Sequence, residues 1–223
     1  MQLKILFFFS IIIFSSSVLN AQLYETIEKN SADLLILLSN KDSSYKKDLE
    51  NLKSLLLQDV NSDELEKTYL TSLSEYDSLK NHLSEFETEL KNISLDSALV
   101  LFNQWYLHLS NVFYNYAENK FFSSDKTKII LFSTSMSCYC TLEMCKNQTT
   151  DILRFVNENN GEYDYWIIDS YEHNDLQIKY ETYFAPSVLV LDKNNEMLHK
   201  IEYEAELNDK LVEFFNMNHK AGE

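Results

Sequence analysis

Apolar residues recur at helical spacing through the first half of the chain, where residues 23–118 contain neither glycine nor proline. Spacings of three and four residues place such side chains on one face of a helix. Polar stretches interrupt the pattern at 39–42, 61–64 and 92–96. Ser62, followed by acidic residues, has the character of a helix N-cap. We predict three or four helices packed as an antiparallel bundle.

The last of these helices is predicted over about residues 96–119 and is rich in aromatic residues. We expect this aromatic stripe to lie in the core or to pack against the second half of the chain. Its members are Phe102, Trp105, Tyr106, Phe113, Tyr114 and Tyr116.

From Lys128 onward the hydrophobic period changes to that of buried strands alternating with helices. Apolar runs predict strands at 129–132, 165–169, 187–192 and 197–203. Amphipathic segments predict helices at 141–159, 175–184 and 207–217. Parallel strands joined by helices, then a hairpin and a closing helix, predict an α/β fold with a mixed central sheet covered on both faces.

The N-terminal 21 residues have the pattern of an export signal. A positive charge at Lys4 precedes an apolar stretch that is short for a membrane span, and the small residue Ala21 suits cleavage. We expect residues 1–21 to be a signal peptide and the mature protein to be periplasmic or secreted, without membrane insertion. The predicted domains are a helical region at 22–119 and an α/β domain at 120–223.

The formal net charge of −16 disfavours binding to nucleic acid or to anionic membranes. The chain has two glycines, Gly161 and Gly222, and therefore no glycine-rich phosphate loop. A nucleotide-dependent enzyme is excluded on that ground, and we expect no cofactor.

Three cysteines lie within eight residues, at Cys138, Cys140 and Cys145, directly after a predicted strand. An odd number of cysteines in an exported protein excludes a framework of paired disulfides and indicates a local reactive site. The only proline, Pro186, directly precedes the third predicted strand. Proline is the residue for which a cis peptide bond costs little, so its single use there suggests a geometric requirement.

A cysteine cluster after one strand and an Ala-Pro pair before another resemble the thioredoxin-like superfamily over about residues 121–219. The resemblance implies a thioredoxin-like fold and a reactive cysteine at the start of a helix, where backbone N–H groups stabilise the thiolate. It also implies a cis peptide bond between Ala185 and Pro186, which would face the cysteines and receive a substrate backbone. The spacing departs from the family, because Cys138-x-Cys140-x4-Cys145 replaces Cys-x-x-Cys.

Three functions follow from this cluster. The first is thiol–disulfide exchange with exported proteins, in which Cys138 is the nucleophile and Cys140 or Cys145 the resolving thiol. The second is a soft-metal site, since three thiolates suit copper(I) or zinc. The third is a non-catalytic thioredoxin-like scaffold that binds partners through its helical region.

Overall fold

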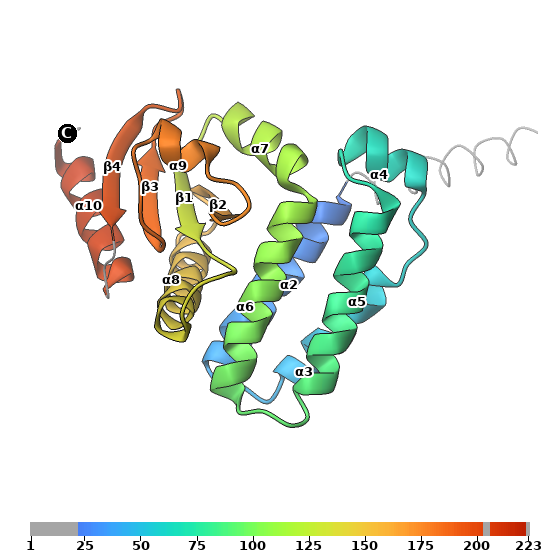
Figure 1. Ribbon diagram of the computed structural model, residues 1–223. Helices are drawn as coiled ribbons and strands as arrows, with labels where there is room; N and C mark the ends of the chain where they lie inside the picture. The colour runs from blue at the N-terminus through green and yellow to red at the C-terminus, as the bar shows by residue number, and fades with distance from the viewer. Residues whose placement is uncertain (1–21, 203–205, 222–223) are drawn as a thin grey trace, which may run out of the picture.

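The structure is a computed structural model that describes residues 22–202 and 206–221, with side chains through residue 217. The predicted signal peptide lies outside the described residues. Figure 1 shows a group of long helices beside a smaller layer that contains the sheet. None of the described helices is long and apolar enough to cross a membrane.

In the described part of the chain, from residue 22 onward, six helices precede the first strand, more than the three or four predicted. Their bounds are α2 Leu23–Ser39, α3 Tyr45–Leu56, α4 Ser62–Thr68, α5 Leu73–Glu89, α6 Leu95–Val112 and α7 Tyr114–Ser123. Helices α2, α3, α5 and α6 pack on one another as a bundle, and the short α4 connects α3 to α5. The predicted all-helical N-terminal region is confirmed.

Two predicted helix boundaries in the bundle are wrong. The N-cap of α4 is Asn61, whose side chain accepts a hydrogen bond from the N–H of Asp63, and Ser62 is already helical. The apolar period continues through residues 69–72, yet the helix breaks there. Ser72 begins α5 with a reciprocal capping box to Glu75, which satisfies two N–H groups at the helix end.

The helix predicted at 96–119 also breaks, at Phe113, so that α7 leaves the bundle and crosses to the sheet. Phe113 is fully buried among Tyr24, Tyr69 and Tyr76, so side-chain packing sets the bend without glycine or proline. The predicted role of the aromatic stripe in core packing is confirmed. The boundary expected at residues 119 and 120 falls inside α7, and the division into domains stays a prediction.

The second half forms a mixed four-stranded sheet flanked by helices, as predicted. Its strands are β1 Lys128–Ser133, β2 Asp164–Asp169, β3 Ser187–Leu191 and β4 Met197–Glu202. Its helices are α8 Tyr139–Glu158, α9 Asp175–Lys179 and α10 Leu207–Ala221. The order across the sheet is β2-β1-β3-β4, with β1 parallel to β2 and antiparallel to β3. Helix α9 ends five residues earlier than predicted, and Glu181 follows in the left-handed region.

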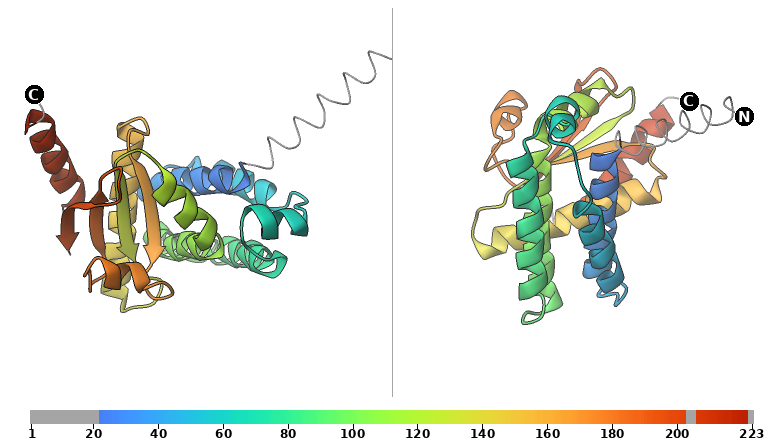
Figure 2. Two further views of the ribbon diagram at one scale, coloured as in Figure 1. Left: turned by 90° about the horizontal axis from the view of Figure 1, so that it is seen from above. Right: turned by 90° about the vertical axis from the view of Figure 1, so that its right-hand side faces the viewer.

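Successive residues of β1 point to opposite faces of the sheet, as the period of a strand requires. Ile129 and Leu131 join the core beneath α8 and α10, whereas Ile130 and Phe132 join the core beneath α7 and α9. In the right-hand view of Figure 2, α8 lies on one side of the sheet and α7 and α9 lie on the other. All of β1 is buried, so each full aliphatic side chain contributes about 1.5–3 kcal/mol.

The bundle and the sheet share one hydrophobic core. Buried residues of α2, α5 and α6 belong to the same cluster as those of β1 and α8. Helix α6 lies along the outer edge of β2, and Ser110 Oγ donates to the carbonyl of Ile167 at 2.6 Å. An edge strand with unpaired backbone groups invites association with other chains, so this cover protects β2.

Candidate functional site

The cysteine loop, residues 134–138, connects β1 to α8. Cys138 is the N-cap of α8, and Cys140 is the second residue of that helix. The helix continues for 20 residues, so its positive dipole end and its free N–H groups lie beside the thiols. This is the position that the sequence predicted for a reactive cysteine.

The two thiols of the loop lie side by side on the surface. Cys138 Sγ is 2.7 Å from Cys140 Sγ and 3.2 Å from Thr141 Oγ1. Both cysteines are exposed and unbonded. A thiol that is accessible, next to a second thiol and at a helix N-terminus has the features of a redox-active cysteine.

Hydrogen bonds lower the pKa of Cys138. Donation from the Cys140 thiol, and then from the Thr141 hydroxyl, stabilises the Cys138 thiolate and lowers its pKa to about 7. A free cysteine titrates near 8.5, so a large share of Cys138 is the nucleophilic thiolate at neutral pH.

Cys145 has a different environment from the other two cysteines. It is fully buried on the inner side of α8, and burial raises the pKa of its thiol. Five helical residues separate it from Cys140, which turns its side chain well away from that thiol. Of the three predicted site cysteines, the structure therefore pairs Cys138 with Cys140 and places Cys145 in the interior as a small apolar residue.

The described residues contain no group of three or more histidine, cysteine or acidic side chains arranged to hold a metal ion. The three cysteine sulfurs do not form one ligand set, because Cys145 is buried whereas Cys138 and Cys140 are exposed.

The sheet register brings Pro186 to the end of β1 from which the cysteine loop departs. Phe132 pairs with Ser187, so Pro186 stands level with Ser133. Pro186 is buried, Ala185 is partly exposed, and the peptide bond between them is cis. The two segments singled out in the sequence thus meet at one end of the sheet.

Large apolar side chains are exposed at this same end. The C-terminal ends of β1 and β2 and the N-terminal end of β3 meet there, because β1 runs parallel to β2 and antiparallel to β3. We call the exposed side chains that emerge here the apolar rim. They are 58–70% exposed and comprise Met136, Tyr139, Tyr171, Tyr183 and Phe184. Exposed aromatic and methionine side chains are typical of surfaces that bind polypeptides.

Helix α6 holds the cysteine loop from the side. Gln104 Nε2 donates to the carbonyl of Ser135 at 3.0 Å. Asn111 Nδ2 donates to Asp169 Oδ2 at 3.2 Å, and Asp169 Oδ1 accepts the N–H of Ser135 at 3.0 Å. Gln104 therefore holds the loop directly, and Asn111 holds it indirectly through Asp169.

Sequence reasoning missed Gln104 and Asn111. Asp169 also caps the turn after β2, because it accepts the N–H of Tyr171 at 3.1 Å. Gln104 and Asn111 lie on α6, far along the chain from Asp169 and the cysteine loop, and none of the three belongs to a recognisable motif. The sequence signal for these contacts is the presence of amide side chains on an otherwise apolar helix. It indicates that one face of this helix makes polar contacts.

No protein-family model matches this sequence, and no curated protein matches it. Among solved structures, the chain is similar to a designed protein, with 19% identity and a TM-score of 0.35. It is also similar to the thioredoxin NaTrxh from Nicotiana alata, with 14% identity and a TM-score of 0.33. Each match covers 45% of this chain and 84% of the other. These similarities are too loose to assign a family or an activity.

Removing the neighbouring donors should raise the pKa of Cys138. We expect the rate of iodoacetamide alkylation to rise with pH around a midpoint near 7, because hydrogen bonds lower the pKa of the Cys138 thiol to about 7. Cys140→Ala should move the midpoint upward, because it removes the donor that lies nearest to Cys138 Sγ. Thr141→Val should move it in the same direction by less, and Thr141→Ser, which keeps the hydroxyl, should leave it unchanged. A midpoint near 8.5 in the wild-type protein would contradict this account of the site.

Gln104→Ala should loosen the cysteine loop. The lost hydrogen bond is worth about 1 kcal/mol, which corresponds to roughly fivefold faster amide exchange of residues 134–138. Hydrogen–deuterium exchange read by mass spectrometry measures this change. The exposed residue Gln58 provides the control, since Gln58→Ala should leave the loop unaffected. Equal exchange in the two variants would show that α6 does not hold the loop.

Proposed function

We propose that this protein exchanges thiols and disulfides with polypeptide substrates through Cys138 and Cys140. The observation that carries the proposal is the exposed pair of sulfur atoms 2.7 Å apart at the N-terminus of α8. The lowered pKa of Cys138 makes it the nucleophile. Cys140, the exposed second residue of α8, is the resolving thiol.

The exchange proceeds in two balanced steps. The Cys138 thiolate attacks one sulfur of a substrate disulfide, and the other substrate sulfur leaves as a thiolate that takes a proton from water. The Cys140 thiol then loses its proton to solvent and attacks Cys138 Sγ, which releases the second substrate thiolate. The substrate gains two electrons and two protons, and the protein is left with a Cys138–Cys140 disulfide. The reverse sequence oxidises a substrate dithiol.

The surroundings of the thiols support a polypeptide as the substrate. The apolar rim offers contact area around the cysteines, and Ala185 with Pro186 lies at the same end of the sheet. A peptide that binds there places its own sulfur beside Cys138. The acidic surface, with a formal net charge of −16, favours substrates that are basic or neutral over acidic ones.

We further propose that the exchange takes place outside the cytoplasm, with residues 1–21 acting as the export signal. Oxidising compartments are where proteins contain the disulfides that such a site would act on. A thiol or disulfide carrier of that compartment would return the cysteine pair to its starting state.

The pair should titrate as one two-electron couple. Equilibration in glutathione buffers between about −100 and −300 mV, followed by alkylation and mass spectrometry, should show Cys138 and Cys140 changing state together. Cys145→Ser should leave the midpoint unchanged, because the buried thiol takes no part, whereas Cys140→Ser should abolish the transition. If no pair of cysteines changes state across this range, the proposed exchange is wrong.

A further inference from the structure

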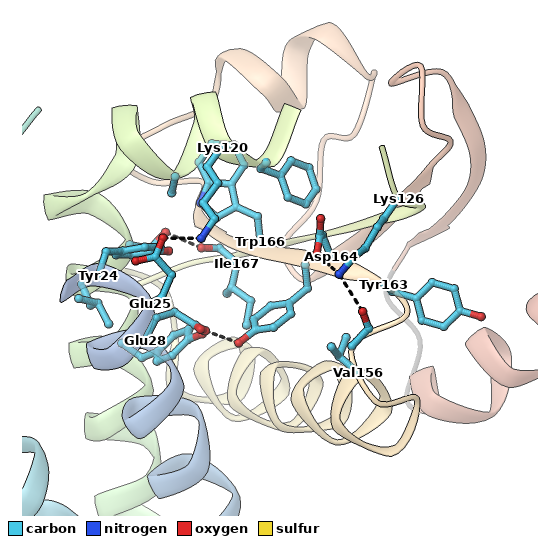
Figure 3. A pocket seen from close by; sticks show the side chains of 17 residues that line it. Tyr24, Glu25, Glu28, Lys120, Lys126, Val156, Tyr163, Asp164, Trp166 and Ile167 are labelled. Atoms are coloured by element: carbon cyan, nitrogen blue, oxygen red, sulfur yellow. Dashed lines mark hydrogen bonds and ion pairs between the residues drawn. The ribbon is translucent and has the colours of Figure 1, made fainter. Parts of the chain in front are cut away.

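A cavity lies between the helical region and β2, on the far side of the molecule from the cysteine loop. Its volume is about 280 Å³, close to the lower end of the roughly 300–1,000 Å³ typical of small-molecule sites. Side chains from α2, α6, α7 and the first half of β2 form its walls, as Figure 3 shows. The cysteine loop lies at the opposite, C-terminal end of β1 and β2.

The charged side chains of this cavity do not balance. Lys120 forms an ion pair with Glu25, and Lys126 forms an ion pair with Asp164 at 3.2 Å. Figure 3 shows the two ion pairs at opposite sides of the view, each formed within its own pair of residues. Glu28 also lines the cavity and forms no ion pair with any described residue. Burial raises the pKa of its carboxyl group, and a bound cation would favour its ionised form.

The hydrogen bonds of Glu28 leave half of its carboxylate open. The hydroxyls of Tyr106 and Tyr165 both donate to the same oxygen, Oε1. The other oxygen, Oε2, accepts no hydrogen bond from the part of the chain that the structure describes. A carboxylate has about four acceptor positions, so Glu28 retains room for a charged donor. One turn earlier on α2, the buried Oε2 of Glu25 likewise lacks a described partner.

The remaining walls of the cavity are aromatic. Tyr24, Tyr106 and Tyr165 surround the Glu28 end, and Phe121 and Trp166 lie on the side formed by α7 and β2. Aromatic faces attract ammonium groups and also accept apolar rings. The combination of one unpaired carboxylate with several aromatic rings is suited to a small molecule that carries both features.

We propose that this cavity binds a primary organic ammonium ion that bears an aromatic or apolar body. The ammonium group donates to Glu28 Oε2 and is flanked by the tyrosine rings, while the body occupies the space beside Phe121 and Trp166. An anionic ligand is disfavoured because it would meet an unneutralised carboxylate. The proposal is independent of the thiol chemistry, since none of the three cysteines lines the cavity.

Binding of phenethylamine, compared with 3-phenylpropionate, tests the proposal. The two probes share a ring but carry opposite charges. Isothermal titration calorimetry on the full chain should give a dissociation constant at least tenfold lower for phenethylamine. Glu28→Gln should weaken phenethylamine binding at least tenfold. Asp33→Asn, which removes an exposed carboxylate elsewhere on α2, should leave it unchanged. Absence of phenethylamine binding, or equal binding of the two probes, would overturn the proposal.

A measurement on the unaltered protein covers the case in which Glu28→Gln fails to fold. The chain has two tryptophans, of which Trp166 lines the cavity and Trp105 is buried in the bundle. Phenethylamine should shift the indole N–H resonance of Trp166 in a nuclear magnetic resonance spectrum and leave that of Trp105 in place. Shifts of equal size at both resonances, or at neither, would place the ligand elsewhere and refute the site.

Discussion

The packing of α6 against the edge of β2 is the contact on which the rest of the structure depends. It seals a strand edge that would otherwise be open, joins the bundle and the sheet into one core and brings amide side chains to the cysteine loop. The hydrogen bond from Ser110 to the Ile167 carbonyl is one specific contact in this interface. Both sites depend on this contact, since α6 contributes side chains to each of them. The cysteine loop lies at the C-terminal end of β2, and the cavity at Glu28 lies at its N-terminal end.

The local electrostatic environment of Cys138 opposes the effect of the net charge of the whole protein. A net charge of −16 disfavours a thiolate at the surface. Local donors nevertheless lower the pKa of Cys138, because Cys140 and Thr141 lie within 3.2 Å of its sulfur and the field of the remaining surface is screened by salt. The short range of these contacts is why the geometry of the loop matters, and why its attachment to α6 bears on reactivity.

Much of the α/β half could be predicted from the sequence because its strands are short apolar runs with polar ends. The order of its elements was read correctly from that pattern. The meeting of the cysteine loop with Pro186 was implied by the resemblance to a known superfamily. The helix breaks at residues 69–72 and at Phe113 were missed, because neither has a proline or glycine and the apolar period continues through both. Burial of Phe113 among tyrosines decides the second break, and such tertiary packing leaves no local signal.

The candidate site was predictable in position but not in composition. In the sequence the three neighbouring cysteines form one cluster. The turn of the helix is what separates the buried Cys145 from the exposed Cys138 and Cys140. The contacts from Gln104 to Ser135 and from Asn111 to Asp169 span 31 and 58 residues, so no spacing rule reveals them. The cavity at Glu28 likewise joins residues from both halves of the chain, which the sequence presented as separate regions.

Trapping of a mixed disulfide tests the assignment of the nucleophile most directly. The Cys140→Ser protein should accumulate a covalent adduct on Cys138 when it is mixed with a disulfide-containing polypeptide, because the resolving thiol is absent. The Cys138→Ser protein should accumulate far less. Intact mass spectrometry and peptide mapping identify the adduct and its position. Adducts on Cys145, or equal trapping by the two variants, would contradict the account.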